Sequence, residues 1–497
     1  MATTETTTGI AESLARVFPL GSRLNERGRL EVGGCDTIEL AREFGTPAYV
    51  VAEDDLRARA RAFVEAARAA CLEAGATSGH GATSGHGAEL HVLFASKAFP
   101  CTAVLRTLAQ EGLWCDVASG GEMHLALRAG FAPERLVLHG NAKSEAELRM
   151  ALRHRVGLIV IDNLDEIDCL ERLLADDLDP TRPRAGGECP PASAEGELTG
   201  MPPQPVLVRA TPNVRGDTHE KISTGQADSK FGFAMDQVAA AVERIRAVPG
   251  LALEGVHAHI GSQLFDLEPF RREVAQLAGL RELAAVGGSG ADGSGVGDSA
   301  VGGSGADGSG PGFPTWDLGG GLGVAYTADQ RPPAIGEYVG ALVEVARECL
   351  GDYRRLLIEP GRALTANAAV TLYAVQSVKR NVSTWVAVDG GMSDNLRPML
   401  YGAVYEAHVA DRPGGGTPCV LAGKHCESGD VIVREALLDD PRPGDVIVTP
   451  ATGAYGYAMA NNYNGVPRPP VIFCKDGDAR VVVRRESYED LISRDVG

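Results

Sequence analysis

The sequence of 497 residues has no long apolar run, no excess of positive charge and no paired-cysteine pattern. No apolar stretch reaches the length that a helix needs to cross a bilayer, which argues against a membrane-spanning protein. The formal net charge of −19 makes a nucleic-acid backbone or an anionic membrane surface an unsuitable partner. A small anionic ligand is still compatible with this charge, because a local site can carry the opposite sign.

The ten cysteines are scattered and include no CxxC pair. The first residues, "MATTETTTGIAESL", lack the basic and apolar regions of a secretory signal. Both observations predict reduced thiols and a cytoplasmic location. A hydrophobic content of 44 % and a charged content of 23 % are typical of a globular protein, and this length allows about two to three domains.

Three segments have the composition of flexible inserts: 76–88, 180–205 and 286–312. The first contains "ATSGHG" twice, the second is rich in Pro, Gly and Glu, and the third carries "VGGSGADGSG" at both ends. Such segments bury too little apolar surface to offset their ordering entropy, so we expect surface loops. His80 and His86 in the first repeat raise the alternative of a metal site, but a duplicated flexible loop is the simpler interpretation and we expect no metal.

Outside these inserts, short apolar runs alternate with stretches of helical periodicity. The eight runs are 91–97, 113–119, 135–141, 157–162, 205–211, 253–262, 314–323 and 355–362. Eight strand–helix repeats predict an α/β fold, a closed parallel (β/α)8 TIM barrel that we place at residues 47–364. From residue 365 to 497, closely spaced strand-like runs separated by Gly, Pro and Asp predict an all-β domain of sandwich or barrel type, completed by residues 1–46.

Reactive side chains fall at the carboxyl ends of the predicted barrel strands, the face that carries the active site in this architecture. They are Lys97, Asp116, His139, Asn141, His257, His259, Ser262, Asp317, Glu359 and Arg362. Taken alone, Lys97 could be an ordinary lysine at a strand exit with its ammonium in water. The convergence of ten polar positions on one face favours a functional role instead.

Two of the loops on this face are suited to a phosphate group. "DLGGGLG" (317–323) and "EPGR" (359–362) offer backbone N–H groups after the last two predicted strands, where phosphate sites of such barrels often lie. Pyridoxal 5′-phosphate (PLP) would use both the cradle and a lysine, because its aldehyde forms a Schiff base with an amine. Glu359 is the candidate carboxylate for its ring nitrogen, and His259 could cover its flat face.

The motifs together resemble one family of enzymes. They are "ASKAF", "CDVASGGE", "LHGNAKS", "HEKISTGQADSKFG", "HAHIGSQ", "DLGGGLG", "EPGR", "VDGGMSDNLRPMLY", "CESGD" and "GAYGYAMANNYNG". In this order they resemble the alanine-racemase-like, fold-type III PLP decarboxylases, and most closely the diaminopimelate decarboxylases. One departure is "KAF", where many relatives have "KAN".

The resemblance implies roles for individual positions. Lys97 would hold the cofactor as a Schiff base and Cys426 would donate a proton, which makes these two the catalytic residues. The other residues implied to bind the cofactor are His259, Ser262, Gly320, Gly321, Glu359, Gly361, Arg362 and Tyr455. The "CESGD" loop enters the active site from a partner subunit in this family, which implies a homodimer with shared sites.

The expected substrate, meso-2,6-diaminopimelate, has a second amino-acid head, so its site needs both a cation and an anion. Arg362, Arg397 and Tyr401 offer donors suited to the distal carboxylate, and Glu427 offers an anion for the distal ammonium. The resemblance places Tyr455 beside both cofactor and substrate. The implied reaction yields L-lysine and CO₂ and is the last step of lysine biosynthesis. Three alternatives stay open: a decarboxylase of ornithine or arginine, a non-catalytic PLP-binding relative, and a sugar-phosphate barrel enzyme that would leave the β domain without a role.

Overall fold

We describe the chain from a computed structural model, which places residues 11–76, 88–177, 202–214, 229–284 and 312–497. The predicted inserts 76–88 and 286–312 lie almost wholly outside these described residues, as does most of 180–205. The end of the second insert is corrected: Gln204 and Pro205 already belong to a barrel strand, paired with Leu251 and Ala252. Among the described residues, no helix is long and apolar enough to cross a membrane.

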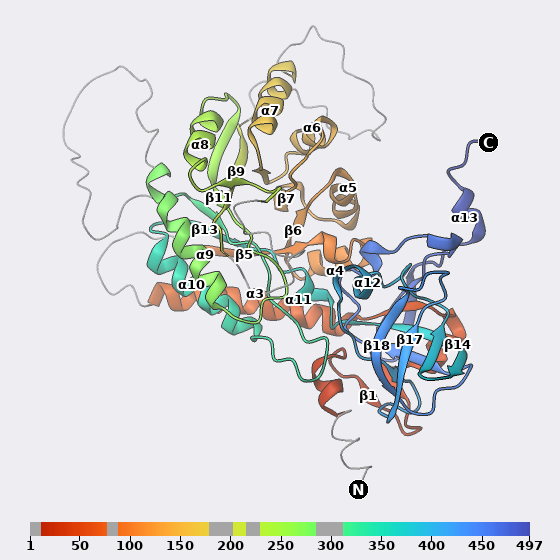
Figure 1. The fold of residues 1–497 in the computed structure, drawn as a ribbon. Coiled ribbons are helices and arrows are strands. Elements are labelled where there is room, and N and C mark those ends of the chain that lie inside the picture. The colour runs from red at the N-terminus through yellow and green to blue at the C-terminus, as the bar shows by residue number, and fades with distance from the viewer. Residues whose placement is uncertain (1–10, 77–87, 178–201, 215–228, 285–311) are drawn as a thin grey trace, which may run out of the picture.

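The first domain is a closed barrel of eight parallel strands, as the sequence predicts (Figure 1). In spatial order around the barrel the strands are β5 (Glu89–Ala95), β6 (Trp114–Val117), β7 (Leu136–Leu138), β8 (Leu158–Ile161), β9 (Gln204–Thr211), β11 (Leu251–His257), β12 (Thr315–Asp317) and β13 (Arg355–Ile358). β13 pairs with β5 and closes the ring, and a short strand β10 (Phe233–Ala234) adds to β9.

Every second side chain of the short apolar strands points inward, and these side chains fill the inside of the ring. One buried cluster unites inward-facing side chains of five strands: Leu93, Val137, Leu158, Val160, Leu207 and Leu357. The intervening residues face outward against the helices, where the largest core cluster includes Val92 and Phe94 from β5 and Cys115 and Val117 from β6. The period of two therefore makes the barrel a packed core, and an opening for chemistry is left only at its ends.

Helices surround the barrel. They are α3 (Glu53–Ala76), α4 (Thr102–Gln110), α5 (Gly120–Ala129), α6 (Glu145–His154), α7 (Leu164–Asp177), α8 (Val238–Arg246), α9 (Glu268–Leu277) and α10 (Ile335–Cys349), with the one-turn helix α11 (Arg362–Thr365) after β13. Local sequence sets where several of them begin: Ser119 caps α5, and Ser144 forms a reciprocal capping box with Glu147 at the start of α6. The connections from β6 to α5 and from β7 to α6 are short, and they keep the residues after these two strands at the barrel mouth.

The second domain is all-β. Its main sheet runs in the order β18 (Val431–Leu438), β17 (Thr417–Ala422), β15 (Thr384–Val388), β14 (Ala369–Arg380), β4 (Ala48–Ala52), β20 (Val471–Lys475) and β21 (Asp478–Val483), with β19 (Val446–Thr449) on β14 and β16 (His408–Val409) on β19. A small sheet of β1 (Arg23–Leu24), β2 (Leu30–Val32) and β3 (Cys35–Asp36), the helix α2 (Thr37–Phe44) and the short helices α12 (Arg397–Tyr401) and α13 (Tyr488–Ile492) complete it. β4 lies just beyond the segment 1–46 that we assigned to this domain, and it is the N-terminal strand that enters the main sheet between β14 and β20.

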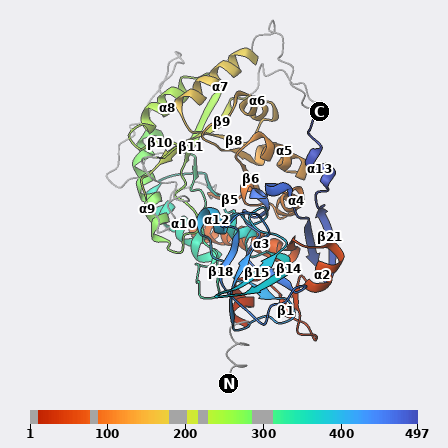
Figure 2. The same cartoon turned by 45° about the vertical axis from the view of Figure 1, so that its right-hand side comes forward.

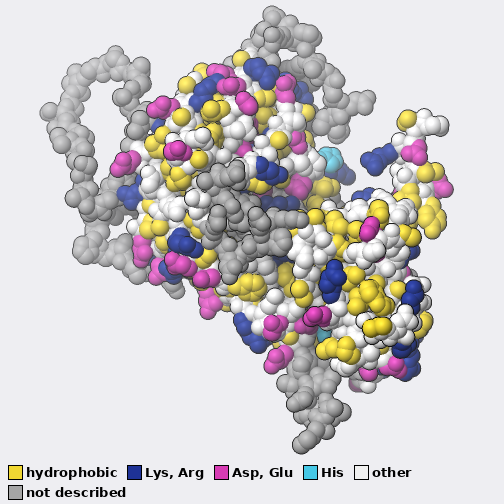
Figure 3. Space-filling view, in the orientation of Figure 1, with side chains coloured by type: hydrophobic (Ala, Val, Ile, Leu, Met, Phe, Trp, Pro, Cys, Tyr) yellow, Lys and Arg dark blue, Asp and Glu magenta, His cyan; other side chains and the backbone are white. Residues whose placement is uncertain are grey.

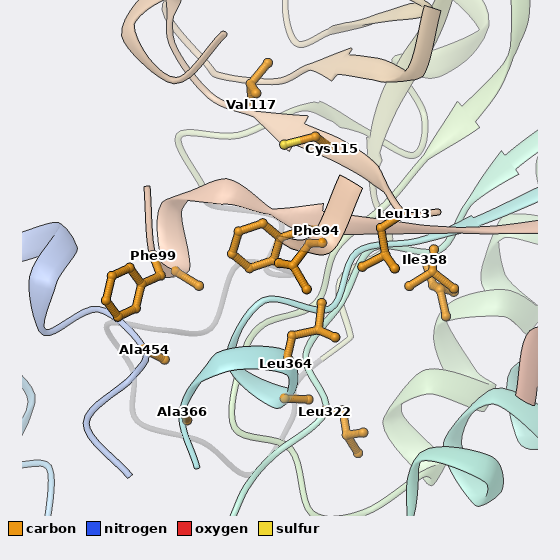
Figure 4. Close-up of a cluster of buried hydrophobic side chains, with 14 of the residues drawn as sticks. Phe94, Phe99, Leu113, Cys115, Val117, Leu322, Ile358, Leu364, Ala366 and Ala454 are labelled. Atoms are coloured by element: carbon orange, nitrogen blue, oxygen red, sulfur yellow. The ribbon is translucent and has the colours of Figure 1, made fainter. Parts of the chain in front are cut away.

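The two domains meet next to the residue that the sequence singled out, Lys97. In both cartoon views the β domain lies against the barrel beside α3 and α4 (Figures 1 and 2). Figure 4 shows the buried cluster at this junction, in which Phe94 and Phe99 of the barrel lie near Leu364 of α11 and Ala454 of the β domain. The Phe99 ring stacks on Tyr457, with ring centroids 5.0 Å apart. The segment 454–457 is thereby fixed against the residues that flank Lys97.

Candidate active site

Lys97 lies at the barrel mouth in a short 3₁₀ turn (Ser96–Ala98) directly after β5. Its Nζ is 3.6 Å from Oδ2 of Asp116 at the end of β6, and the Lys97 side chain is 46 % exposed whereas Asp116 is buried. The Asp116 carboxylate raises the pKa of Lys97, so in the absence of a ligand the amine is held as an ammonium. Lys97 is therefore a reachable amine in a turn whose flanking residues, Ser96 and Ala98, are buried.

Glu359, at the end of β13, is the centre of a buried group of acids and imidazoles. Its Oε1 is 2.7 Å from Nε2 of His139 and its Oε2 is 3.7 Å from Nε2 of His257, and the two imidazole centroids are 4.8 Å apart. His139 Nε2 is also 3.7 Å from Oδ1 of Asp116. A continuous polar chain thus runs from Lys97 through Asp116 and His139 to Glu359.

The environment assigns different protonation states to the members of this group. Burial raises the pKa of Glu359, but His139 and His257 outweigh burial and hold it well below its usual value. Burial and the nearby Glu359 raise the pKa of Asp317 well above its usual value, and burial lowers the pKa of His257 to about 3. The environment therefore favours an ionised Glu359, the protonated form of Asp317 and a neutral His257.

The glycine-rich turn after β12 approaches the neighbouring loops more closely than any side chain would allow. A Cβ at Gly320 would lie 2.1 Å from the carbonyl oxygen of Glu359, and one at Gly321, whose φ is +129°, would lie 2.6 Å from that of Gly261. The Gly320 N–H donates to Nδ1 of His259 over 3.1 Å. Burial and the charge of Lys97 lower the pKa of His259 well below its usual value, so the ring is neutral with its proton on Nε2.

Arg362 and Arg397 form a buried pair of cations that is held by tyrosines. Arg362 donates to the hydroxyls of Ser262 and Tyr326, and Arg397 donates to the hydroxyl of Tyr405. The Arg397 guanidinium lies 4.8 Å from the centroid of the Tyr326 ring. Both arginines are 5 % exposed, and within the described part of the chain neither forms an ion pair with a carboxylate. Two buried guanidinium groups without a counter-charge constitute a site for anionic groups.

Two further predicted residues lie beside this pair. Tyr455 has a φ of +65°, its N–H donates to the carbonyl oxygen of Ala98, and its ring centroid is 5.0 Å from the Arg362 guanidinium. Gly361 precedes Arg362, and a Cβ there would lie 3.0 Å from the Cβ of Ala95 on β5. Both contacts bring the Arg362 turn and the segment of Tyr455 onto the strand and turn that carry Lys97.

Cys426 and Glu427 are not brought to this mouth by the contacts of their own chain. They are exposed in the loop between β17 and β18, and the Cys426 N–H donates to Oδ1 of Asn464 in the same β domain. Of the nine described cysteines, only Cys426 is exposed. Tyr401 is half-buried at the end of α12, one turn after Arg397.

Several side chains of the site were given no role from the sequence. Asp116, His139, His257 and Asp317 were noted only as strand-end residues, although their place at the barrel mouth was a usable signal. Tyr326 and Tyr405 were missed, because buried tyrosines in apolar surroundings have the sequence signature of core residues. Arg209, buried on β9, also contributes positive charge near Glu359 and Asp317.

The donor set fits PLP. Buried Glu359, held ionised by His139, lies at the barrel mouth near an amine that is open to approach. The glycine turn, Ser262 and Arg362 offer the donors that a phosphate needs. His139, His257, Asp317 and Glu359 have potential ligand atoms within 4.8 Å of one another, a spacing that a metal ion could also use. The adjacent Lys97 and the glycine turn are better explained by an organic cofactor that carries a phosphate.

Comparison with known proteins agrees with this geometry. Residues 82–292 and 299–366 match the model of the family described as "Pyridoxal-dependent decarboxylase, pyridoxal binding domain". The chain is 40 % identical to the diaminopimelate decarboxylase of Bacillus subtilis, over 96 % of this chain and 97 % of that protein. The chain belongs to the diaminopimelate decarboxylase family. It is also 39 % identical to the Mycobacterium tuberculosis enzyme of this family, over 97 % of this chain and 98 % of that one.

Solved structures extend the similarity to the whole fold. The crystal structure of diaminopimelate decarboxylase from M. jannaschii in complex with L-lysine matches with a TM-score of 0.78 and 29 % identity, over 96 % of this chain and 98 % of that one. The Helicobacter pylori enzyme, also with L-lysine, matches with a TM-score of 0.73 and 27 % identity over 92 % and 98 % of the two chains. The predicted barrel, β domain and PLP cofactor are confirmed by family and fold.

Proposed function

We propose that this protein decarboxylates meso-2,6-diaminopimelate to L-lysine and CO₂ with PLP as cofactor, as the last step of lysine biosynthesis. The observation that carries the proposal is the buried pair Arg362 and Arg397, which lies beside the predicted cofactor site and forms no ion pair with a carboxylate of the described residues. One guanidinium suits the cofactor phosphate through its link to Ser262, and the second is left for an anion on the substrate.

The residues of the barrel mouth have different roles around the cofactor. PLP, when bound, supplies an electron sink for the electron pair that CO₂ leaves behind. Lys97 provides the amine that holds the cofactor, and Asp116 keeps this side chain charged until the cofactor is bound. Glu359 is held ionised by His139 and His257, which supports a role in keeping a proton on the ring nitrogen. His259, neutral and fixed by the Gly320 N–H, covers the ring, while Ser262, Gly320, Gly321, Gly361 and Arg362 bind the phosphate.

The substrate residues follow from the two charges at the far end of diaminopimelate. Arg397, oriented by Tyr405 and by the face of Tyr326, binds the distal carboxylate together with Tyr401 and Tyr455. Glu427 binds the distal ammonium, and the Cys426 thiol delivers a proton to the carbon that has lost CO₂. Ornithine and arginine lack a distal carboxylate and would leave the buried Arg397 unpaired.

We further propose a homodimer in the cytoplasm, in which Cys426 and Glu427 complete the active site of the partner subunit. The support is that both residues project from their own β domain, away from the hydrogen bonds that order the barrel mouth. Hydrophobic side chains also gather on the surface of the β domain around α12 and β18 (Figure 3), where Leu400, Val404 and Leu437 are exposed. The cytoplasmic location is supported by nine described cysteines that are all free.

The test is the release of CO₂ by purified protein with PLP, with meso-diaminopimelate, L-ornithine, L-arginine and L-lysine offered separately. We expect release from diaminopimelate alone. Release from ornithine or arginine at a similar kcat/KM would keep the cofactor chemistry and contradict the roles of Arg397 and Glu427. Normal PLP binding without release from any substrate would identify the protein as a non-catalytic relative.

A further inference from the structure

One buried carboxylate joins two loops of the β domain that the proposed function uses. Asp430, 3 % exposed, accepts the N–H of Met392 on Oδ1 over 2.7 Å and the N–H of His425 on Oδ2 over 2.9 Å. The Nδ1 atom of His425 is 2.8 Å from the same Oδ2. Within the described residues, no lysine or arginine forms an ion pair with Asp430. Two backbone amides and one imidazole therefore compensate its charge.

Each of the two loops has a glycine, Gly391 or Gly423, directly against the Asp430 carboxylate. A Cβ at Gly391 would be 2.5 Å from both carboxylate oxygens of Asp430, and one at Gly423 would be 2.1 Å from Oδ2. A backbone hydrogen bond from Lys424 N–H to the Gly390 carbonyl oxygen links the same two loops over 2.9 Å. The Asp430 side chain thus fills space that both loops leave open, and a longer residue at Gly391 or Gly423 would displace it.

His425 fixes the second loop directly before Cys426. Because a carboxylate only accepts hydrogen bonds, the Nδ1 atom of His425 must carry the proton. The buried imidazole stacks on Tyr463, with centroids 5.7 Å apart, and the next residue, Cys426, is anchored by its N–H on Asn464. The backbone around Cys426 is therefore ordered from both sides although its thiol faces solvent.

The two joined loops lead in different directions. The loop of Gly391 and Met392 leads into Arg397, which packs on Tyr326 of its own barrel. The loop of His425 leads into Cys426 and Glu427, which project from the surface. In the proposed dimer, one loop of each pair serves its own subunit's active site and the other serves the partner's.

We propose that Asp430, with His425, is a positioning residue that fixes the position of the two loops relative to each other. One carboxylate of each chain would then set the geometry of both active sites of the dimer. The proposal rests on the proposed function for the roles of Arg397, Cys426 and Glu427. Asp430→Asn tests it, because the amide replaces one acceptor oxygen by an NH₂ group that faces a backbone N–H. Asp439→Asn, which removes an exposed carboxylate after β18 in the same domain, is the matched control.

The experiment uses mixed dimers with a single intact active site. One chain carries Lys97→Ala and the other carries Cys426→Ala, so the intact site combines Lys97 and Arg397 of the second chain with Cys426 and Glu427 of the first. Asp430→Asn is then placed in either chain. In the first chain we expect kcat to fall about 10- to 100-fold, and in the second we expect the KM for diaminopimelate to rise about tenfold or more.

The two arms separate a positioning role from a general loss of folding. Visible absorbance of bound PLP is expected to stay at the level of the Asp439→Asn dimers, because the cofactor is held by the barrel. An unchanged KM with Asp430→Asn in the second chain, or an unchanged kcat with it in the first, overturns the proposal. If the wild-type protein releases CO₂ but the mixed dimers recover no activity, the proposed decarboxylation stands, whereas the shared active site and the link through Asp430 are both overturned.

A second pair of variants decides the matter if Asp430→Asn does not fold. His425→Asn keeps an N–H donor near the position of Nδ1, whereas His425→Leu removes it. We expect His425→Asn to retain several-fold more kcat/KM than His425→Leu at equal PLP content. Equal activity of the two variants contradicts the role of the His425–Asp430 contact.

Discussion

The barrel mouth and the Cys426 loop differ in how completely one chain builds them. At the mouth, Asp116, His139 and Glu359 are buried. His139 Nε2 lies 3.7 Å from an Asp116 carboxylate oxygen and 2.7 Å from one of Glu359, and the amine of Lys97 beside them is open to approach. The Cys426 loop has an ordered backbone, but its thiol and the Glu427 carboxylate face solvent. In the proposed dimer, this difference predicts that one chain holds the cofactor, whereas catalysis needs a second chain against the loop.

The largest expected effect is on the barrel side. Lys97→Ala removes the reachable amine, and we expect decarboxylation to fall by roughly 1,000-fold or more, together with the visible absorbance of bound PLP. Lys379→Ala, an exposed lysine of β14, is the control. Absorbance and kinetics of both variants check this, and an unchanged PLP spectrum in Lys97→Ala would show that another amine holds the cofactor.

The second-largest effect on activity is expected at the Cys426 loop. Cys426→Ala removes the proposed proton donor and leaves the residues that are proposed to hold the cofactor unchanged, so we expect kcat to fall roughly 100-fold with PLP absorbance unchanged. Cys71→Ala, at a half-buried thiol of α3, serves as the control. Loss of PLP from Cys426→Ala protein would contradict the division between a cofactor half and a loop half.

A smaller effect is expected at Arg397, which lies between the two regions. Arg397→Lys keeps a positive charge but loses the planar group that packs on Tyr326 and that is proposed to bind a carboxylate through two N–H donors. We expect the KM for meso-diaminopimelate to rise about tenfold or more, with a smaller change in kcat. Steady-state kinetics test this, and a change in kcat alone would place Arg397 outside the substrate site.

The smallest effect concerns stability. Burial raises the pKa of Asp394, which lies in the loop before Arg397, from its ordinary 3.8 to about 7. Between these values the unfolded chain loses the proton while the folded chain keeps it, so Asp394 lowers the free energy of unfolding as pH rises from about 4 to about 7. We expect this loss, of the order of 1 to 4 kcal/mol, to be absent in Asp394→Asn.

Denaturant unfolding of the wild type and of Asp394→Asn at several pH values measures this loss of stability. The quantity to compare is the difference in unfolding free energy between wild type and Asp394→Asn, since other titrating groups cancel in it. The wild type is expected to lose stability relative to the variant over this range. A difference that does not change with pH would contradict the burial of an uncharged Asp394.

The sequence predicted the barrel well because its strands are short apolar runs, and their carboxyl ends necessarily meet on one face. Lys97, Glu359 and His259 could be placed for this reason. Tyr326 and Tyr405 could not, since their hydroxyls are committed to arginines that only the fold brings near them. The predicted run 205–211 missed only the first residue of β9, Gln204, which precedes a proline, a residue that usually interrupts a strand pattern.

The contacts of the β domain were the hardest to foresee. Asp430 belongs to a recognisable motif, but its partner Met392 lies 38 residues earlier in the chain, and no local periodicity connects them. The close approaches at Gly391 and Gly423 likewise depend on the packing of two distant loops. Long-range contacts of this kind follow from tertiary structure, and spacing in the sequence does not encode them.

The measurement that tests the account most directly is complementation between Lys97→Ala and Cys426→Ala chains. The two inactive proteins are dissociated, mixed in equal amounts and reassociated, so that about half of the dimers contain one intact site. We predict recovery of about 25 % of the wild-type decarboxylation of meso-diaminopimelate, because one site in two is intact in half of the dimers. No recovery from correctly reassociated, PLP-loaded dimers would contradict the claim that the Cys426 loop completes the barrel mouth of the partner.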